Sequence, residues 1–273
     1  MLELIKAILF GIVEGITEWL PISSTGHMIL LNEFVTLNVS EEFWEMFLVV
    51  IQLGAILAVV LLFWKKIFPF DFGKEPIVKK DIFVLWGKIL VACIPAAVVG
   101  ILFDDLLDEY LYNYTVVSFS LIIFGIAFLI IENQNKGKSS RINSLAEITW
   151  NTALIIGLFQ LIAAVFPGTS RSGATIVGAL MIGVSRTVAA EFTFFLAIPV
   201  MLGASLLKLL KFGFTFSVSE LMILLTGMLV AFLVSVLVIR FLMGYIKKHD
   251  FKVFGWYRII LGTLVLAYFS VFA

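Results

Sequence analysis

Long apolar runs separated by short polar segments dominate the pattern along the chain. Six of these runs are long enough to cross roughly 30 Å of hydrocarbon as helices. They lie near residues 43–64, 82–103, 115–131, 188–210, 219–243 and 253–272. The pattern therefore predicts six transmembrane helices.

Two further apolar segments, about 4–34 and 150–183, are interrupted by polar clusters rich in Ser and Thr. The interruptions fall at Pro21 and at Pro167-Gly168, and neither half of each segment is long enough to span a bilayer. A helix, a polar turn and a second short helix fit a re-entrant hairpin, which enters the membrane and returns to the same side. We therefore expect two such hairpins.

The two broken segments occupy matching places, and each is followed by three predicted spans. An offset of 146 residues aligns Pro21 with Pro167 and Ser24 with Ser170. Three crossings per half is an odd number, so the second half enters the membrane from the opposite face. The prediction is an all-α integral membrane protein with six transmembrane helices and two re-entrant helical hairpins in an inverted-topology repeat, with the hairpin tips meeting near the midplane.

The repeat also defines the domain organisation. Residues 1–273 are expected to form a single membrane domain. Its halves are about 1–135 and 146–273, and a cytoplasmic loop joins them.

The charges of the connecting segments predict the orientation. Cations gather in 65–80, which includes Lys74, in 132–149 and in 244–252, and six spans put all three segments on one side. The segment 104–109, with Asp104, Asp105, Asp108 and Glu109, is expected to be an acidic loop on the other side. The positive-inside rule then places the basic loops in the cytoplasm and both termini outside.

Composition narrows the class of protein further. The chain is 62% hydrophobic and 14% charged, which is more apolar surface than one soluble core of 273 residues can hide. Its formal net charge is zero, so we expect no nucleic-acid partner. The single Cys93 lies in an apolar run and is expected to be a small core residue without redox chemistry.

Glu14 and Glu18 are the first candidate functional residues. They are four positions apart on a helical stretch, so both carboxylates lie on one face and can share a cation. The alternative is that they face the water interface or pair with a buried Arg.

The polar run after Pro21 is the second candidate. It offers hydroxyl and imidazole groups where a new helix starts, and free backbone N–H groups at such a helix end bind anions. The side chains are those of Ser23, Ser24, Thr25 and His27. This arrangement suits a phosphate, although Ser and Thr are also ordinary helix caps.

The second hairpin carries a similar turn from Pro167 to Thr175. Arg171 would lie at membrane depth, where its guanidinium can bind two phosphate oxygens at once. The alternative is an ion pair with Glu45 or Glu191 that stabilises the fold. The neighbouring groups expected to bind substrate are Gly168, Thr169, Ser170 and Ser172. Arg258 is expected either to reach the headgroups or to belong to an ion-pair network.

With these motifs the chain resembles the undecaprenyl-diphosphate phosphatases of the bacitracin-resistance family. The shared elements are E-x-x-x-E at Glu14 to Glu18, S-S-T-G-H at Ser23 to His27, and P-G-x-S-R-S-G-A-T at Pro167 to Thr175. The resemblance implies hydrolysis of a C55 isoprenyl diphosphate to its monophosphate at the outer face of the bacterial plasma membrane, with a divalent cation. It further implies recycling of the carrier for peptidoglycan synthesis and lowered sensitivity to bacitracin.

One mechanism has Ser24 attack the terminal phosphorus with His27 as its base. Arg171, Ser170 and Ser172 would hold the phosphate, while Glu14 and Glu18 would position Mg²⁺ or Ca²⁺ through oxygen ligands. A rival scheme makes His27 the direct nucleophile or the activator of a water molecule. The catalytic candidates are thus Ser24, His27, Glu18 and Arg171.

A transporter or flippase for lipid-linked phosphates is the competing class, because inverted repeats with broken helices are a transporter design. A carrier, however, has no use for a nucleophile and base beside an Arg. The expected partners are undecaprenyl diphosphate and membrane lipids, and a homodimer is considered as well.

Overall fold

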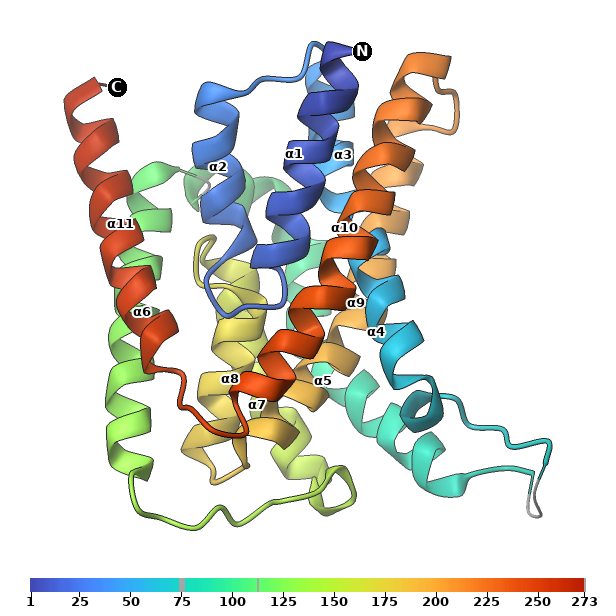
Figure 1. Ribbon diagram of the computed structural model, residues 1–273, viewed down its shortest axis with the longest axis vertical. Helices are drawn as coiled ribbons and strands as arrows, with labels where there is room; N and C mark the ends of the chain where they lie inside the picture. Colours follow the sequence, from blue (N-terminus) through green and yellow to red (C-terminus); the bar gives the residue numbers. More distant parts are fainter. Residues whose placement is uncertain (74–76, 112, 273) are drawn as a thin grey trace.

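The chain forms a helical bundle in the computed structural model, which describes residues 1–73, 77–111 and 113–272 (Figure 1). The side chains of residues 104, 105, 108 and 272 lie outside that description. Some predictions therefore fall outside the described residues, namely those for Lys74 and for the carboxylates of Asp104, Asp105 and Asp108. Within them there are two isolated β-bridges and no strand.

Six helical stretches are long and apolar enough to cross a membrane. They are α3 and α4 together (Glu41–Val50 and Gln52–Ile67), α5 (Lys80–Leu111), α6 (Tyr114–Asn135), α9 (Arg186–Phe212), α10 (Val218–Tyr245) and α11 (Lys252–Phe272). Apart from the end of α5, each begins and ends within a few residues of a predicted span, so the six predicted spans are confirmed for the described chain. The length of an apolar run identifies such helices, because the thickness of the hydrocarbon layer sets how many residues a spanning helix needs.

One predicted loop is wrong. The acidic segment 104–109 is not a loop, because α5 continues as a helix to Leu111. The sequence contains no Gly or Pro between residues 101 and 113, so nothing ends the helix where its apolar run ends.

Two pairs of shorter helices complete the bundle. The first pair is α1 (Leu2–Thr17) and α2 (Ser24–Phe34), and the second is α7 (Trp150–Val165) and α8 (Arg171–Met181). In Figure 1, α1 runs from the end of the bundle that carries the termini to about mid-height, and α2 returns to that end. The second pair does the same from the opposite end. Both turns therefore lie inside the bundle.

Small residues let the short helices pack closely against the long ones. Helix α1 packs on α10, α7 on α5, and α6 on α11. A Cβ atom added to Gly157 of α7 would lie 2.4 Å from the carbonyl oxygen of Ala92 in α5. Such close backbone approach is typical of helices that pack within a membrane.

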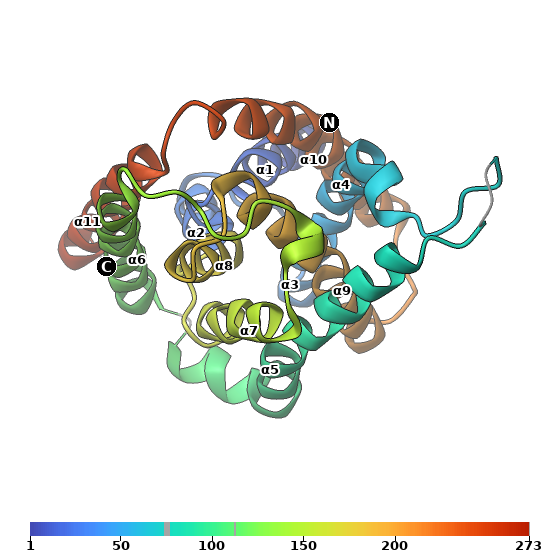
Figure 2. The same cartoon turned by 90° about the horizontal axis from the view of Figure 1, so that it is seen from below.

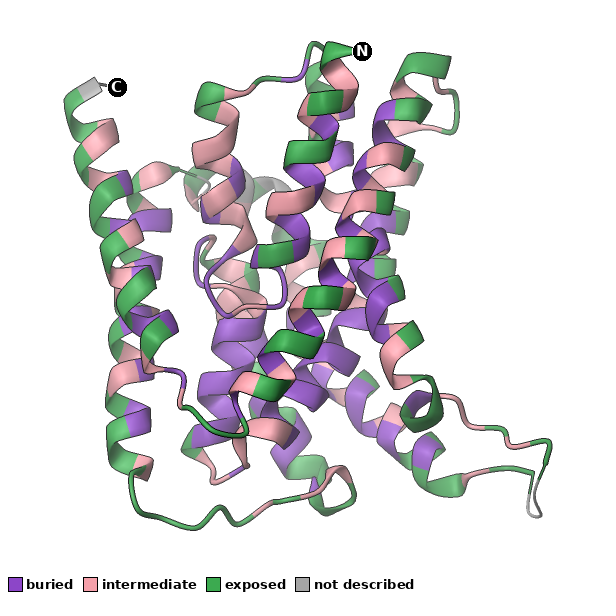
Figure 3. Cartoon of the chain, in the orientation of Figure 1, coloured by how far each residue is buried: buried purple, intermediate pink, exposed green. Residues whose placement is uncertain are grey.

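The outer surface is largely apolar, as Figure 3 shows by the exposed residues along the outward sides of the long helices. Leu61 of α4, Ile123 of α6 and Leu237 of α10 all expose more than half of their surface. A soluble protein does not leave so many large apolar side chains uncovered. The chain is a multi-pass membrane protein.

The three basic segments gather at one end of the bundle, and Figure 2 views the molecule from that end. Both termini lie at the other end (Figure 1). This arrangement agrees with the parity expected of six spans. A short 3₁₀ turn, η1 (Leu145–Glu147), lies in the segment that leads into α7.

Candidate active site where two helical turns meet

The helices α2 and α8 begin in the same way. Ser23 and Ser170 are their N-caps, with φ of 76° and 69°, a backbone region that residues with a Cβ atom rarely adopt. Each serine hydroxyl accepts a hydrogen bond from the backbone N–H three residues on, at Gly26 and Gly173.

These caps correct the alignment of the two turns. Ser23 corresponds to Ser170, which is one position more than the offset that aligns Pro21 with Pro167. The expected match of Ser24 with Ser170 is therefore wrong in the structure. Ser24 instead corresponds to Arg171, since each is the first residue of an 11-residue helix.

Arg258 of α11 joins the two turns. Its guanidinium donates to the carbonyl oxygen of Pro21 at 3.3 Å and to those of Gly168 and Thr169 at 3.0 and 2.7 Å. It also donates to the carbonyl of Leu121 in α6. These bonds fix the start of α2 next to the start of α8, so the two polar turns form one site.

A carboxylate lies at the centre of this site. Glu18 accepts a hydrogen bond from the Ser24 hydroxyl at 2.8 Å on Oε2 and from Arg171 Nη2 at 3.0 Å on Oε1. The Glu18 side chain is 7% exposed and that of Arg171 12%. A hydroxyl and a guanidinium, the first residues of α2 and α8, are thus held on either side of one buried carboxylate.

Neighbouring groups keep Arg171 and Glu18 in place. Arg171 Nη1 donates to the carbonyl of Thr193 in α9, and Ser172 donates to the carbonyl of Glu18. The Ser170 and Ser172 hydroxyls lie 3.1 Å apart. The second turn therefore packs its hydroxyls against the end of α1.

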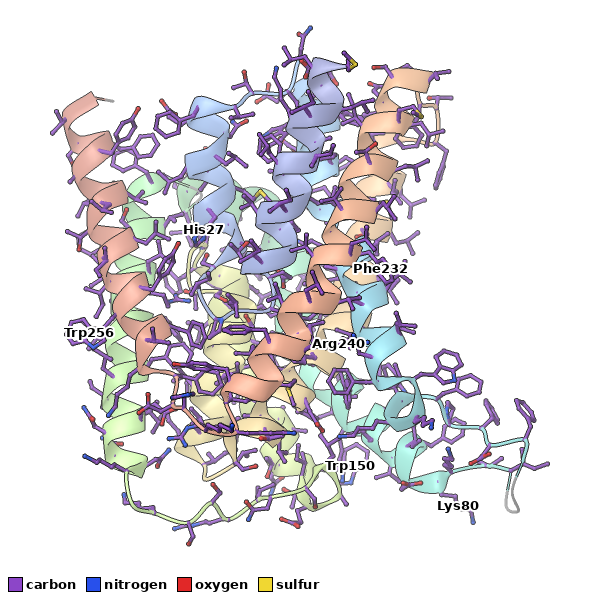
Figure 4. The ribbon with its side chains drawn as sticks, in the orientation of Figure 1. His27, Lys80, Trp150, Phe232, Arg240 and Trp256 are labelled. Atoms are coloured by element: carbon purple, nitrogen blue, oxygen red, sulfur yellow. The ribbon has the colours of Figure 1, made fainter. Side chains whose placement is uncertain are left out.

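His27 forms its hydrogen bonds with residues other than Ser24. Its Nδ1 is 2.7 Å from the carbonyl oxygen of Ser23, and its Nε2 is 2.7 Å from the hydroxyl of Tyr257. Because a carbonyl only accepts, Nδ1 carries the proton and Tyr257 donates to Nε2. Figure 4 shows His27 on α2, towards α11. The hydroxyl of Ser24 is held by Glu18 and not by His27, contrary to the expected pairing.

The alternative partners expected for Arg171 are engaged elsewhere. Glu191 accepts from Lys66 at 2.7 and 2.8 Å, and Glu45 pairs with Lys208 at 3.3 Å. Arg171 forms its ion pair with Glu18, so the alternative of a pair with Glu45 or Glu191 is wrong, and the alternative of a buried Arg as partner is confirmed for Glu18.

Three buried polar atoms at the site have no hydrogen-bond partner among the described residues. They are Oε1 of Glu14, whose carboxyl lies beside that of Glu18, Nε of Arg171 and Oγ1 of Thr169. Buried polar groups in proteins are normally satisfied, so such atoms mark a place for a ligand. An unpartnered carboxylate oxygen next to a second carboxylate fits a hard divalent cation, so Glu14 and Glu18 are the residues that could hold one.

The other predicted binding residues are near the turns but have structural contacts. Ser23 is a buried cap, and the carbonyl groups of Gly168 and Thr169 bind Arg258. Gly168 has a φ of 87°, and an added Cβ would lie 2.6 Å from the carbonyl oxygen of Val117. Thr25 is half-buried, and its hydroxyl forms no hydrogen bond with the described residues.

Sequence reasoning missed Tyr257 and predicted the wrong role for Arg258. Arg258 is fully buried and contacts carbonyl groups, so it neither reaches the headgroups nor pairs with a carboxylate among the described residues. Its only signal in the sequence is a cation within an otherwise apolar run. Tyr257, next to it on α11, carries no such signal.

The chain is similar to known proteins over nearly its whole length. A family model described as bacitracin resistance protein BacA matches residues 7–264. A protein of Desulfitobacterium hafniense named undecaprenyl-diphosphatase is 69% identical over 270 residues, covering 99% of this chain and 97% of the relative. Undecaprenyl-diphosphatase 1 of Clostridium acetobutylicum is 67% identical, covering 99% and 98%. An undecaprenyl-diphosphatase of Enterococcus faecalis is 64% identical, covering 97% and 96%.

Proposed function

The chain belongs to the bacitracin resistance protein BacA family, and we propose that it hydrolyses undecaprenyl diphosphate to undecaprenyl phosphate and inorganic phosphate. The observation that carries this proposal is the Ser24–Glu18–Arg171 cluster, in which a hydroxyl, a carboxylate and a guanidinium share one buried site. The activity recycles the lipid carrier for peptidoglycan synthesis and confers bacitracin resistance.

The proposed fold in the membrane is an inverted-topology repeat of two halves, about 1–135 and 146–273, in a single domain. Each half begins with a re-entrant hairpin, α1–α2 or α7–α8. The equal lengths of α1 and α7 and of α2 and α8, and the equivalent N-caps of α2 and α8, support the proposal. Polar turns at membrane depth are tolerated only where protein or a wet cavity surrounds them. Arg258 provides such protein contacts by donating hydrogen bonds to carbonyl oxygens of both turns.

In the proposed reaction Ser24 Oγ attacks the terminal phosphorus. A bond forms between Oγ and phosphorus, the bond from phosphorus to the bridging oxygen breaks, and undecaprenyl phosphate leaves. Glu18 takes the proton of the Ser24 hydroxyl, because their oxygen atoms are already 2.8 Å apart. A water molecule then hydrolyses the phosphoserine and returns the hydroxyl.

Arg171 and the two helix N-termini stabilise the negative charge of the reacting phosphate. The guanidinium remains charged when buried, and its unpartnered Nε–H adds a donor to the site. The starts of α2 and α8 direct backbone N–H groups towards the same place, and Ser170 and Ser172 supply hydroxyls.

Glu14 and Glu18 would hold the divalent cation, Mg²⁺ or Ca²⁺. The unpartnered Oε1 of Glu14 supports this assignment. A bound cation supplies charge that offsets the negative charge of the diphosphate.

His27 has a positioning role in this scheme. Its Nδ1–H group holds the carbonyl of Ser23, whose backbone has positive φ, and so stabilises the turn that presents Ser24. The rival scheme, with His27 as nucleophile, requires a free Nε2 lone pair, which the Tyr257 hydroxyl occupies.

The proposed location is the bacterial plasma membrane, with both termini outside and the site open to the outer face. The transporter or flippase is not favoured, since the relatives are named as diphosphatases. The homodimer stays a prediction.

Phosphate release from undecaprenyl diphosphate by the purified protein with Mg²⁺ tests the function. We expect Ser24→Ala to lower the rate by about four orders of magnitude, and Glu18→Gln by about two to four. Ser219→Ala, which changes an exposed serine of α10, is the matched control and should retain the full rate. Full activity of folded Ser24→Ala would exclude Ser24 as the nucleophile, and an inactive wild type would exclude the hydrolase.

A further inference from the structure

A polar cavity lies at the end of the bundle that carries the basic segments, the end seen in Figure 2. Its volume is about 460 Å³. It is lined by the end of α8, the start of α9, the segment after α6 and the end of α10. None of the groups proposed for hydrolysis lines it.

The cavity carries more positive than negative charge. Its lining cations are Lys138, Arg141, Arg186 and Lys247, and its one lining carboxylate is Glu132. Glu132 is already neutralised, because its buried oxygens accept from Arg186 and from the N–H of Phe251. Nearby Asp250 pairs with Lys252. The side chains of Lys138, Arg141 and Lys247 form no ion pair with the described residues.

Arg186 is held ready for a ligand. Its Nε donates to both oxygens of Glu132, at 2.9 and 3.2 Å, and its Nη2 donates to Oε2. The side chain nevertheless remains 35% exposed, and Nη1 makes no hydrogen bond within the described chain. A guanidinium fixed on one edge and open on the other loses little freedom on binding an anion.

Arg141 is anchored beside it. The N–H groups of Arg141 and Ile142 donate to the carbonyl of Gly183, at 2.8 and 3.2 Å, and the N–H of Ser185 donates back to Ile142. Gly183 has a φ of 86°, and an added Cβ would lie 3.3 Å from the side chain of Arg141. The segment with Arg141 is therefore hydrogen-bonded to the turn between α8 and α9. The same turn ends at Arg186, the first residue of α9.

The start of α9 also faces this cavity. Its N-cap, Ser185, makes no side-chain cap, and Ser185 and Thr187 line the cavity together with Ser139 and Ser140. A helix start without a capping side chain leaves N–H groups available for an anion. Guanidinium forks, ammonium groups, hydroxyls and a helix N-terminus thus surround one space.

We propose that this cavity binds a phosphate group, separate from the one that is hydrolysed. The ligand is either inorganic phosphate or the phosphate of an anionic lipid headgroup, since the same donors serve both. The forks of Arg141 and Arg186 can each bind two oxygens of one phosphate, and the hydroxyls and the start of α9 supply donors for the remaining oxygens.

Calorimetric titration of inorganic phosphate into the purified protein tests the proposal, in a maltoside detergent that carries no phosphate. The wild type should bind at two sites. Arg141→Gln combined with Lys247→Gln should weaken one site about a hundredfold, because each of the two removed charge-assisted hydrogen bonds counts for about a tenfold factor. The same double variant should hydrolyse undecaprenyl diphosphate at the wild-type rate.

The matched control is Lys136→Gln combined with Lys248→Gln, which removes two exposed cations of the same segments that do not line the cavity. It should bind phosphate as the wild type does. Arg171→Gln should lose hydrolysis and keep the cavity site, which separates this proposal from the proposed function. A single phosphate site, lost in Arg171→Gln and unchanged in the cavity variant, would overturn the proposal.

Short-chain phosphatidylglycerol distinguishes the two sources of the phosphate. If the headgroup is the ligand, the lipid should displace inorganic phosphate from the cavity of the wild type. If inorganic phosphate is the ligand, its affinity should not change when the lipid is added.

Discussion

In the proposed reaction His27 holds the turn that presents Ser24 and does not exchange a proton with the substrate. Its Nδ1–H donates to the carbonyl of Ser23 and its Nε2 accepts from Tyr257, while the two rings are stacked nearly parallel with centroids 5.6 Å apart. The residue next to Ser23 is Ser24, so a change in this turn moves the hydroxyl that Glu18 holds.

Two substitutions of His27 separate positioning from proton transfer. An Asn side chain can place an N–H group near the position of Nδ1 but has no counterpart of Nε2. We expect His27→Ala to lower kcat about a hundredfold through misplacement of Ser24. His27→Asn should recover activity to within about tenfold of the wild type, the factor that corresponds to one hydrogen bond. Steady-state phosphate release at several substrate concentrations measures both.

Equal loss in the Asn and Ala variants, together with a changed pH profile of kcat, would instead assign His27 a direct chemical role. Thermal unfolding of both variants serves as the control for folding.

Some residues of the site could be predicted from the sequence and others could not. Glu18, Ser24 and Arg171 are polar groups in apolar surroundings, and membrane burial makes such groups expensive unless they are used. The contacts of Arg258 could not be predicted, because its partners Pro21 and Gly168 lie 237 and 90 positions away. The positive φ of Ser23 likewise depends on the contacts around the turn.

Among the helices and turns, too, some features could be predicted from the sequence and others could not. The spans were predicted to within a few residues because hydrocarbon thickness sets their length. The acidic end of α5 was predicted wrongly as a loop, since the loss of hydrophobicity at Asp104 does not end a helix. The register of the two turns was also wrong by one residue, because the hydrogen bonds of the caps, not Pro21 and Pro167, determine where α2 and α8 begin.

Arg258 makes the two hairpins depend on each other. We expect Arg258→Lys to lower kcat about a hundredfold, because one ammonium group cannot bind the carbonyls of both turns and the site loses its alignment. Phosphate release measures the effect, and thermal unfolding shows how much stability is lost with it. Arg240→Lys, at an exposed position of α10 that is labelled in Figure 4, is the matched control and should change neither quantity.

A variant Arg258→Lys with the wild-type rate would mean that the alignment of the turns does not need this side chain. Loss of stability with an unchanged rate in the folded fraction would make Arg258 purely structural.

For the whole molecule, the decisive property is which end of the bundle faces the cytoplasm. The three basic segments lie at one end and the termini at the other. Helices α1 and α2 of the first hairpin extend into the bundle from the end with the termini (Figure 1). If the basic end is cytoplasmic, α1 and α2 enter from outside and Ser24 serves substrate arriving from the outer face.

Cysteine labelling in intact bacterial cells tests this orientation. Cys93 is first replaced by Ser, and single cysteines are then introduced as Thr215→Cys between α9 and α10, or as Lys136→Cys at the end of α6; both positions are exposed. A membrane-impermeant maleimide should label the cysteine at 215 in intact cells and the one at 136 only after permeabilisation. The reverse pattern would place the basic segments outside, against the usual excess of Lys and Arg in cytoplasmic loops. The cavity at the basic end would then face outwards, and the first hairpin would face the cytoplasm. Because hydrolysis is proposed at the turns inside the bundle and phosphate binding at its basic end, the orientation decides which compartment each proposed site serves.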